Sequence, residues 1–333
     1  MNVTNIADPG QLTRDADMAL ERIAAARAEI GDVIFGQERV VDLALTTLLA
    51  GGHGLLIGVP GLAKTKLVET LGIVVGLEAL RVQFTPDLMP TDILGSEVME
   101  EGQDGRRGFR FIKGPIFAQL LMADEINRAS PKTQSALLQA MQEHHVTVAG
   151  QRHDVPLPFY VLATQNPLEQ EGTYPLPEAQ LDRFLLQVDV GYPDQSAERR
   201  MLFATTGSDE RRVEQILTAP ELMAIQRLVR QLPVPDKVVE AILKLARSAR
   251  PGTGAGGDTD RLIAWGPGPR ASQARMRAVR ATALIDGRLA PSVDDVVALA
   301  EPVLKHRMAL TFAARAEGTT PTAVINRLAA ALE

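Results

Sequence analysis

The stretch Gly58-Val-Pro-Gly-Leu-Ala-Lys64-Thr65 follows an apolar run at 53–57 and precedes a segment with helical periodicity at 67–71. A glycine-rich turn between a strand and a helix directs successive backbone N–H groups inward, and the helix N-terminus adds a partial positive charge. Such a loop binds a polyphosphate, with Lys64 reaching the outer phosphates and the Thr65 hydroxyl ligating Mg²⁺. We therefore predict a phosphate-binding loop made of Gly58, Val59, Pro60, Gly61, Leu62, Ala63, Lys64 and Thr65, with the adjoining Lys66.

Position 63 departs from the usual form of such loops, which carry glycine where this chain has Ala63. A relaxed pattern that accepts alanine arises by accident in on the order of a few per cent of chains of this length. The loop therefore needs support from other parts of the sequence.

The composition limits the kind of protein that this chain forms. Its 333 residues, 45% of them hydrophobic, exceed one average domain and supply apolar material for two cores. The absence of cysteine excludes disulfides, thiolate metal sites and cysteine nucleophiles. With no signal-peptide pattern and no apolar stretch of the roughly 18 residues that a membrane span needs, we expect a cytoplasmic protein. The net charge of −6 argues against nucleic acid as a partner.

Short apolar runs alternate with helical patterns in the first part of the chain. Runs that are apolar throughout indicate strands covered on both faces, as in a parallel sheet flanked by helices. Ligands bind to such sheets beyond the carboxyl ends of the strands. The sequence predicts an α/β fold with five strands, at residues 55–57, 79–84, 120–123, 159–163 and 184–188.

Two hairpins interrupt this alternation, and a helical region follows it. Residues 96–112 and 146–155 each read as two strands around a polar turn. After Pro193 the apolar residues follow helical spacing throughout. We predict two domains, a core with N-terminal helices at 1–193 and an all-α domain at 194–333.

Polar residues follow two of the predicted strands. Asp124 and Glu125 end one apolar run, and Asn166 follows another. Beside a phosphate loop, Asp124 would hold Mg²⁺ and Glu125 would deprotonate an attacking water. Asn166 would hydrogen-bond the terminal phosphate or that water. Each of these signals has an ordinary explanation as the start of a loop, but their conjunction with the phosphate loop supports a nucleotide site.

The chain resembles the AAA+ ATPases, and within them the MoxR family. The resemblance is dense between about residues 33 and 193 and looser in the helical region. It implies that Ala63 is normal, since this family commonly has alanine there. The strings that carry it are Gly58-Val-Pro-Gly-Leu-Ala-Lys-Thr65, Gln83-Phe-Thr-Pro-Asp-Leu88, Asp92-Ile-Leu-Gly-Ser96, Gly114-Pro-Ile-Phe117, Ala123-Asp-Glu-Ile-Asn-Arg128, Lys132-Thr-Gln-Ser-Ala-Leu-Leu138 and Gly172-Thr-Tyr-Pro-Leu-Pro-Glu-Ala-Gln-Leu-Asp-Arg-Phe184.

The resemblance implies roles for three further residues. AAA+ proteins usually form hexameric rings with ATP between subunits, and Arg183 matches the arginine finger that completes a neighbour's site. Its alternative is a surface arginine that pairs with Asp182. Arg270 matches the second sensor arginine of the helical lid, which would touch the γ-phosphate. Gln37 lies in a segment that resembles the one near the adenine, although it also fits a plain helix start.

The resemblance also implies partners and a function. The hairpins match insertions that face the pore or top of the ring, where a client protein could bind. We expect ATP and Mg²⁺ as cofactors, a homo-oligomeric ring, and von Willebrand factor A domain proteins with their clients as partners. The predicted function is ATP hydrolysis coupled to chaperone-like remodelling or maturation of proteins. The alternatives are a magnesium chelatase-type ATPase subunit, a nucleotide-gated scaffold that does not hydrolyse ATP, and a DNA-remodelling AAA+ protein.

Overall fold

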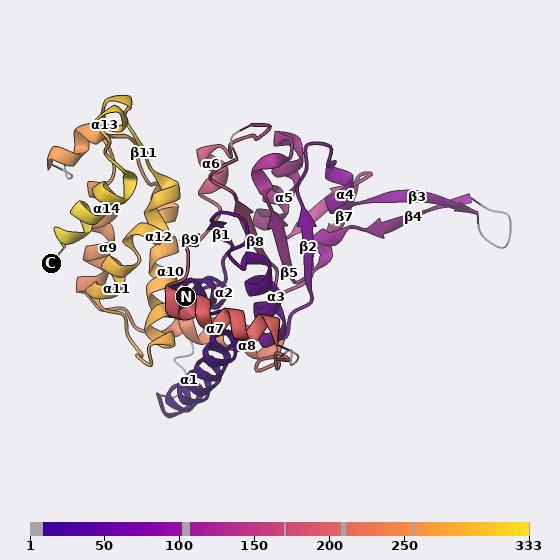
Figure 1. Cartoon of the computed structure of the whole chain (residues 1–333), viewed down its shortest axis with the longest axis horizontal. Coiled ribbons are helices and arrows are strands. Elements are labelled where there is room, and N and C mark those ends of the chain that lie inside the picture. Colours follow the sequence, from indigo (N-terminus) through magenta and orange to yellow (C-terminus); the bar gives the residue numbers. More distant parts are fainter. Residues whose placement is uncertain (1–8, 102–106, 170, 208–210, 255–256, 333) are drawn as a thin grey trace, which may run out of the picture.

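The structure is a computed structural model that describes residues 9–101, 107–169, 171–207, 211–254 and 257–332; the side chains of residues 9–13 and 258 lie outside it. A central sheet of five parallel strands has the order β2-β5-β8-β1-β9 (Figure 1). This confirms the predicted architecture. The strands are β1 (Gly54–Ile57), β2 (Ala79–Gln83), β5 (Leu120–Asp124), β8 (Tyr160–Gln165) and β9 (Leu186–Asp189).

The register brings the polar strand ends to one edge of the sheet. Gln83 of β2 lies opposite Asp124 of β5, and Ile57 of β1 lies opposite Gln165 of β8. All these residues are at the carboxyl ends of their strands, where α/β sheets bind ligands.

The sheet is covered on both faces, because successive residues of a strand point to opposite sides. Leu56 of β1 belongs to an apolar cluster with the N-terminal and C-terminal helices, and Leu55 belongs to a second cluster on the opposite face. Strand β2 differs from the sequence prediction, since it is largely exposed. Its position at the edge of the sheet explains this. The helices of the core are α1 (Pro9–Gly31), α2 (Glu38–Leu49), α3 (Lys64–Val74), α4 (Pro90–Leu94), α5 (Pro131–Glu143) and α6 (Glu178–Leu181), with short 3₁₀ helices η1 (Pro115–Phe117) and η2 (Ile126–Arg128).

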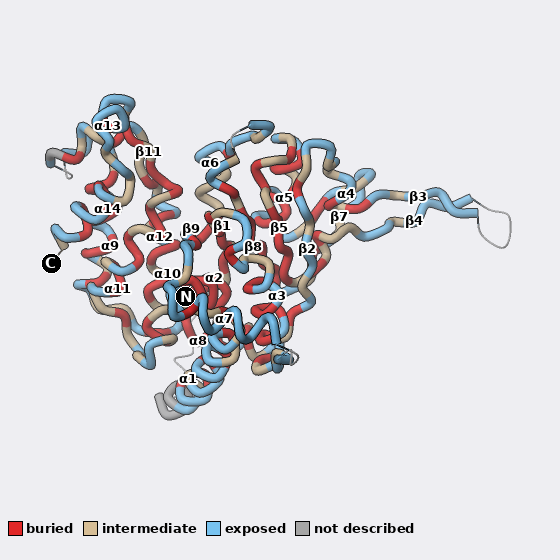
Figure 2. Tube along the Cα trace, viewed as in Figure 1, coloured by how far each residue is buried: buried red, intermediate tan, exposed pale blue. Residues whose placement is uncertain are grey.

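Both predicted hairpins are present. Strands β3 (Gly95–Glu101) and β4 (Arg107–Lys113) form a ribbon that projects from the body of the molecule, and its predicted turn at 102–106 lies outside the described residues (Figure 1). The ribbon is mostly exposed (Figure 2), with Phe109 at 74%. Strands β6 (His145–Val148) and β7 (Gln151–Asp154) form the second hairpin. The two meet where Phe111 stacks on His153, with ring centroids 3.9 Å apart.

In the described residues after Pro193 the regular elements are helices, as predicted, together with a short ribbon of β10 (Ile263–Trp265) and β11 (Ala309–Leu310). None of the helices in the described ranges is long and apolar enough to cross a membrane. The helices are α7 (Gln195–Thr206), α8 (Ala219–Gln231), α9 (Asp236–Ser248), α10 (Pro269–Ile285), α11 (Val293–Ala298), α12 (Ala300–Leu304), α13 (Phe312–Ala316) and α14 (Pro321–Ala330), with 3₁₀ helices η3 (Gly257–Leu262) and η4 (Lys305–Arg307).

Candidate functional site

The predicted phosphate loop lies between β1 and α3, and its backbone is left-handed at Gly61, with φ +85°, and at Ala63, with φ +56°. Glycine adopts this conformation freely, whereas it costs an L-residue roughly 1–2 kcal/mol. This explains why glycine is usual at position 63. Gly58 is required for a different reason, because a Cβ there would lie 2.7 Å from the carbonyl oxygen of Val190.

Lys64 begins α3, and its ammonium group is held at the loop. Its Nζ donates to the carbonyl oxygens of Gly58 and Val59, at 2.7 Å each. Burial lowers the pKa of Lys64, and the negative charges of Asp124 and Glu125 oppose that shift. The ammonium therefore lies within the field of both carboxylates, as a phosphate-binding lysine beside a magnesium site must.

Asp124 ends β5 and is 7% exposed. Its Oδ2 accepts hydrogen bonds from Arg81 Nη2 at 2.5 Å and Nε at 3.0 Å, and its Oδ1 accepts from the Thr164 hydroxyl at 2.5 Å. A cation therefore already lies against this carboxylate. Hard oxygen ligands such as carboxylate and hydroxyl are those that Mg²⁺ prefers, so Asp124 and Thr65 form a donor set that fits this ion.

Glu125 follows in a left-handed conformation, with φ +55°, which turns it out of the line of the strand. Its backbone N–H donates to Thr164 Oγ1 at 2.8 Å. Its Oε2 accepts from Gln83 Nε2 at 2.8 Å and from Arg128 Nη1 at 2.9 Å. The Glu125 carboxylate is therefore held in place by one neutral and one cationic donor.

Asn166 lies just beyond β8 and is 6% exposed. Its Oδ1 accepts a hydrogen bond from the backbone N–H of Leu168 at 3.1 Å, which fixes the orientation of the amide. The NH₂ end is then the one suited to donate to a phosphate or a water.

These residues surround one cavity of about 430 Å³. It brings together ten of the predicted residues: Pro60, Gly61, Leu62, Ala63, Lys64, Thr65, Lys66, Asp124, Glu125 and Asn166. Arg81, Gln83 and Thr164 also line it, although the sequence alone predicts no role for them. Gln83 and Thr164 lie at or next to the ends of predicted strands, which could have indicated them, whereas Arg81 lies inside one.

A second cavity, of about 800 Å³, adjoins the first around the loop. The two share lining residues 60–63 and Lys66, and the second is completed by residues 32–35, Gln37, Tyr192, Pro193 and α7. Gln37 is 8% exposed, and its Nε2 donates to the Leu62 carbonyl at 3.3 Å. Its buried Oε1 has no hydrogen-bond partner in the described part of the chain. It is thus an acceptor suited to the amino group of a base.

Arg183 and Arg270 do not line the phosphate cavity. Both line a separate cavity of about 180 Å³, together with Arg277 and Arg307. Arg183 Nη1 donates to the Leu138 carbonyl, and its Nε is buried with no partner among the residues described. Burial lowers the pKa of Arg183, and the positive charge of Arg270 lowers it further.

The alternative reading of Arg183, a surface arginine that pairs with Asp182, is wrong. Asp182 pairs instead with Arg307, whose Nε lies 2.8 Å from Asp182 Oδ1. The geometry therefore leaves the guanidinium of Arg183 in a cavity lined by four arginines, where it could meet an anion.

Comparison with known proteins identifies the family of the chain. Residues 53–186 match the family model "ATPase family associated with various cellular activities (AAA)", and residues 257–328 match that of the "AAA lid domain". Chaperone MoxR1 of Mycobacterium tuberculosis is 43% identical over 301 residues, which span 90% of this chain and 79% of that protein. The chain belongs to the MoxR family of AAA+ ATPases.

Two further comparisons extend the MoxR likeness over nearly the whole chain. Protein MoxR of Paracoccus denitrificans is 33% identical over 91% of this chain and 94% of its own. A solved structure of a "putative ATPase" from Cytophaga hutchinsonii superposes with a TM-score of 0.88 at 34% identity, covering 96% of each chain. The chain therefore contains a MoxR-family AAA+ domain, a kind of domain that binds nucleotides, and the cavity at the phosphate loop is its candidate nucleotide site.

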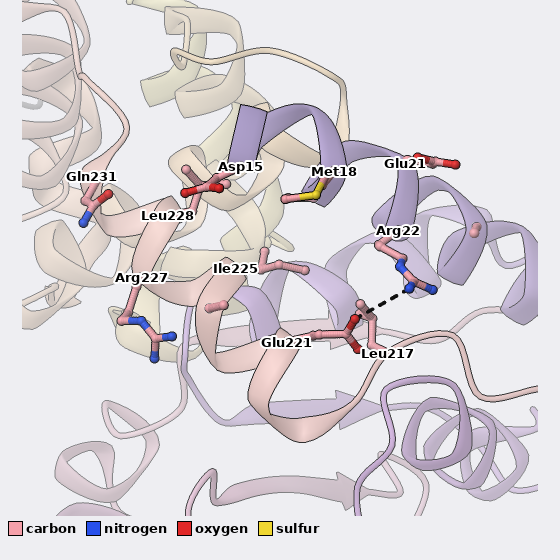
Figure 3. Close-up of a pocket in the computed structure, with 13 residues that line it drawn as sticks. Asp15, Met18, Glu21, Arg22, Leu217, Glu221, Ile225, Arg227, Leu228 and Gln231 are labelled. Atoms are coloured by element: carbon pink, nitrogen blue, oxygen red, sulfur yellow. Dashed lines mark ion pairs between the residues drawn. The ribbon is translucent and has the colours of Figure 1, made fainter. Parts of the chain in front are cut away.

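The structure also has a large cavity away from the phosphate loop. It measures about 710 Å³ and lies between α1 and α8, where Arg22 and Glu221 form an ion pair at 3.6 Å (Figure 3). It contains Met18, Ile225 and Leu228 but none of the predicted site residues. The described lining mixes these apolar side chains with charged ones, among them Asp15, Glu21 and Arg227.

Proposed function

We propose that this chain hydrolyses ATP in a Mg²⁺-dependent reaction, as a subunit of a homo-oligomeric ring that remodels or matures partner proteins. The observation that carries the proposal is the split arrangement of the charged groups. Lys64, Asp124 and Glu125 converge on one cavity, while Arg183 and Arg270 converge on another. In this proposal, the site is completed when two copies of the chain meet.

The phosphate cavity supports the binding step. The loop N–H groups and the Lys64 ammonium would hold the β- and γ-phosphates, as in other phosphate loops. Thr65 and Asp124 would hold Mg²⁺, which neutralises charge on the phosphates when bound. For Asp124 to do so, its ion pair with Arg81 must open. Gln37, with its unpaired buried oxygen, would accept a hydrogen bond from the adenine amino group.

The same cavity supports the chemical step. Glu125 Oε2 would accept the proton of the attacking water, and its bonds to Gln83 and Arg128 would first have to loosen. Asn166 would donate to the γ-phosphate or to this water. A general base typically contributes about 10²- to 10⁴-fold to a rate.

The arginine cavity supports a site shared between subunits. Arg183 and Arg270 would bring positive charge to the γ-phosphate held by a neighbouring copy, where charge accumulates in the transition state. Removing an arginine finger typically costs about 10³- to 10⁵-fold in related phosphoryl transfers. A monomer of this chain should therefore turn over ATP slowly.

The partner proteins are proposed from relatives. A relative that is 43% identical is named a chaperone. We propose that this chain also acts on client proteins as a chaperone does, in association with von Willebrand factor A domain proteins. The exposed β3–β4 ribbon with Phe109 offers an apolar surface that could contact these proteins.

Subunit mixing tests the proposal. Lys64→Ala and Arg183→Ala subunits should each turn over ATP poorly, and Lys237→Ala, on the exposed side of α9, should match the wild type. Mixing the two defective subunits should restore activity, because some interfaces then join an intact Lys64 to an intact Arg183. Failure of rescue in co-assembled rings would contradict the shared site. Glu125→Gln subunits held in ATP should retain client proteins, which can then be identified.

A further inference from the structure

Arg307 is a lid side chain enclosed by the segment that carries Arg183. It lies in η4, directly after α12, and is 2% exposed. Besides its ion pair with Asp182 Oδ1, it donates to the carbonyl oxygen of Asp182 at 3.3 Å, to that of Leu185 at 3.1 Å, and to that of Phe184. The acceptors lie on both sides of Arg183 in the sequence.

The neighbours of Arg307 in η4 bind the same segment. His306 Nε2 donates to the Phe184 carbonyl at 3.1 Å, and Lys305 Nζ lies 2.5 Å from Asp189 Oδ2. Arg307 also donates to the Val303 carbonyl oxygen of the preceding helix α12 at 2.7 Å, which anchors it to the lid. Three consecutive lid residues thus hold the core chain from Asp182 to Asp189.

We propose that Arg307 is a positioning residue that fixes the backbone around Arg183, so that the Arg183 guanidinium reaches the nucleotide held by a neighbouring copy. The inference rests on the proposed role of Arg183. The geometry favours arginine at position 307, because only a planar guanidinium offers five donors in a fixed fork to acceptors on several residues. It also means that the lid sets the geometry of the neighbour's site rather than its own.

The test distinguishes positioning of Arg183 by Arg307 from a role of Arg307 that only holds the lid against the core. In Arg307→Lys, ATP turnover should fall about 10²-fold, since a displacement near 1 Å has that effect. The affinity for ATP should stay within about twofold, because the phosphate cavity of the same chain does not include Arg307. Arg275→Lys is the matched control. Arg275 is an equally buried lid arginine that donates to the Ala300 carbonyl at 3.2 Å, and its variant should keep wild-type turnover.

Subunit mixing supplies the decisive readout. Arg307→Lys subunits should be rescued by Lys64→Ala subunits, which carry a well-placed Arg183, but not by Arg183→Ala subunits. If Arg307→Lys keeps wild-type turnover, or if Lys64→Ala does not rescue it, the inference is overturned.

Two further measurements keep the outcomes distinct. If Arg307→Lys does not fold, Asp182→Asn replaces it in the test. This variant perturbs the same ion pair from the core side, and we expect it to show the same mixing pattern. If Arg183→Ala itself keeps wild-type turnover, the proposed function of Arg183 is wrong. If Arg183→Ala is inactive and rescued while Arg307→Lys is not rescued, only the role of Arg307 is wrong.

Discussion

Arg81 Nη2 lies 2.5 Å from Asp124 Oδ2, so the carboxylate proposed to hold Mg²⁺ is paired with a cation of its own chain. The pairing follows from the sheet, because β2 lies beside β5 and their registers place Arg81 two residues before the partner of Asp124. A metal ion must therefore compete with a guanidinium for this oxygen.

We predict that Arg81→Gln lowers the Mg²⁺ concentration that half-saturates ATP turnover by about threefold to fivefold. Arg81 is half exposed, and a pair of this kind contributes at most about 1 kcal/mol, which corresponds to that factor. A magnesium titration at fixed ATP measures the effect. Arg110→Gln breaks an ion pair with Glu100 on the β3–β4 ribbon, at 2.7 Å, and should leave the titration unchanged. A rise in the half-saturating concentration would show that Arg81 helps binding instead.

Glu125→Gln should reduce ATP turnover by about 10²- to 10⁴-fold while ATP still binds. The amide cannot accept the water proton, but it keeps the size of the side chain. Single-turnover kinetics with equilibrium ATP binding separate the two quantities. Wild-type turnover in this variant would show that Glu125 is not the general base. Glu100→Gln, on the exposed β3–β4 ribbon, is the control and should keep wild-type turnover.

Ala63→Gly should stabilise the nucleotide-free chain by about 1 kcal/mol. Ala63 has φ +56°, and relief of that left-handed strain outweighs the greater freedom of glycine in the unfolded state. Urea unfolding measures the difference. Ala331→Gly is the control, because Ala331 is exposed with φ −76° and its replacement should slightly destabilise. If both variants lose stability equally, Ala63 is not strained.

His53 should make the fold sensitive to acid. It is neutral in the structure, because its Nδ1 accepts from the Val161 N–H at 3.0 Å and its Nε2 donates to the Met141 carbonyl at 3.2 Å. Burial lowers the pKa of His53 to about 4, with smaller contributions from the charges of His144 and Arg277. The unfolded state, with a pKa near 6.5, binds the proton first, so stability falls as pH drops from about 6.5 towards 4.

The expected loss over that interval is roughly 3 kcal/mol, from the difference between the two pKa values. Unfolding measured at several pH values should show a shallower slope in His53→Gln than in the wild type. Some slope should remain, because burial also lowers the pKa of His306 well below its ordinary value. His145→Gln, on a partly exposed hairpin position, should keep the wild-type slope. If the dependence of stability on pH were unchanged in His53→Gln, His53 would not be a source of the acid sensitivity.

Local sequence was sufficient for the phosphate loop and the strand-end groups. A buried parallel strand reads as an apolar run, and the residue after it must lie at the ligand edge, so Asp124, Glu125 and Asn166 could be predicted to lie near Lys64. The roles of the polar residues in β2 were harder to predict, because an edge strand is exposed and its polar residues resemble ordinary surface residues. Arg81 and Gln83 acquire contacts with Asp124 and Glu125 only through the pairing of β2 with β5.

The arginines depended on packing that no short segment encodes. Arg183 and Asp182 are adjacent in sequence, but Asp182 pairs with Arg307, which is 125 positions away. Arg270, which the family resemblance assigns to the γ-phosphate, lines the cavity of Arg183 and not the phosphate cavity of its own chain, so its proposed contact is with a neighbouring copy.

The sequence by itself determined where the candidate catalytic groups lie: the loop at 58–65, the carboxylates at the end of β5 and the amide that follows β8. These are local signals, because each depends only on a strand end and the residue after it. The tertiary structure alone decided which charges meet. Docking of the lid buries Arg307 against the chain around Arg183, and a buried guanidinium must find its acceptors wherever the packed backbone presents them.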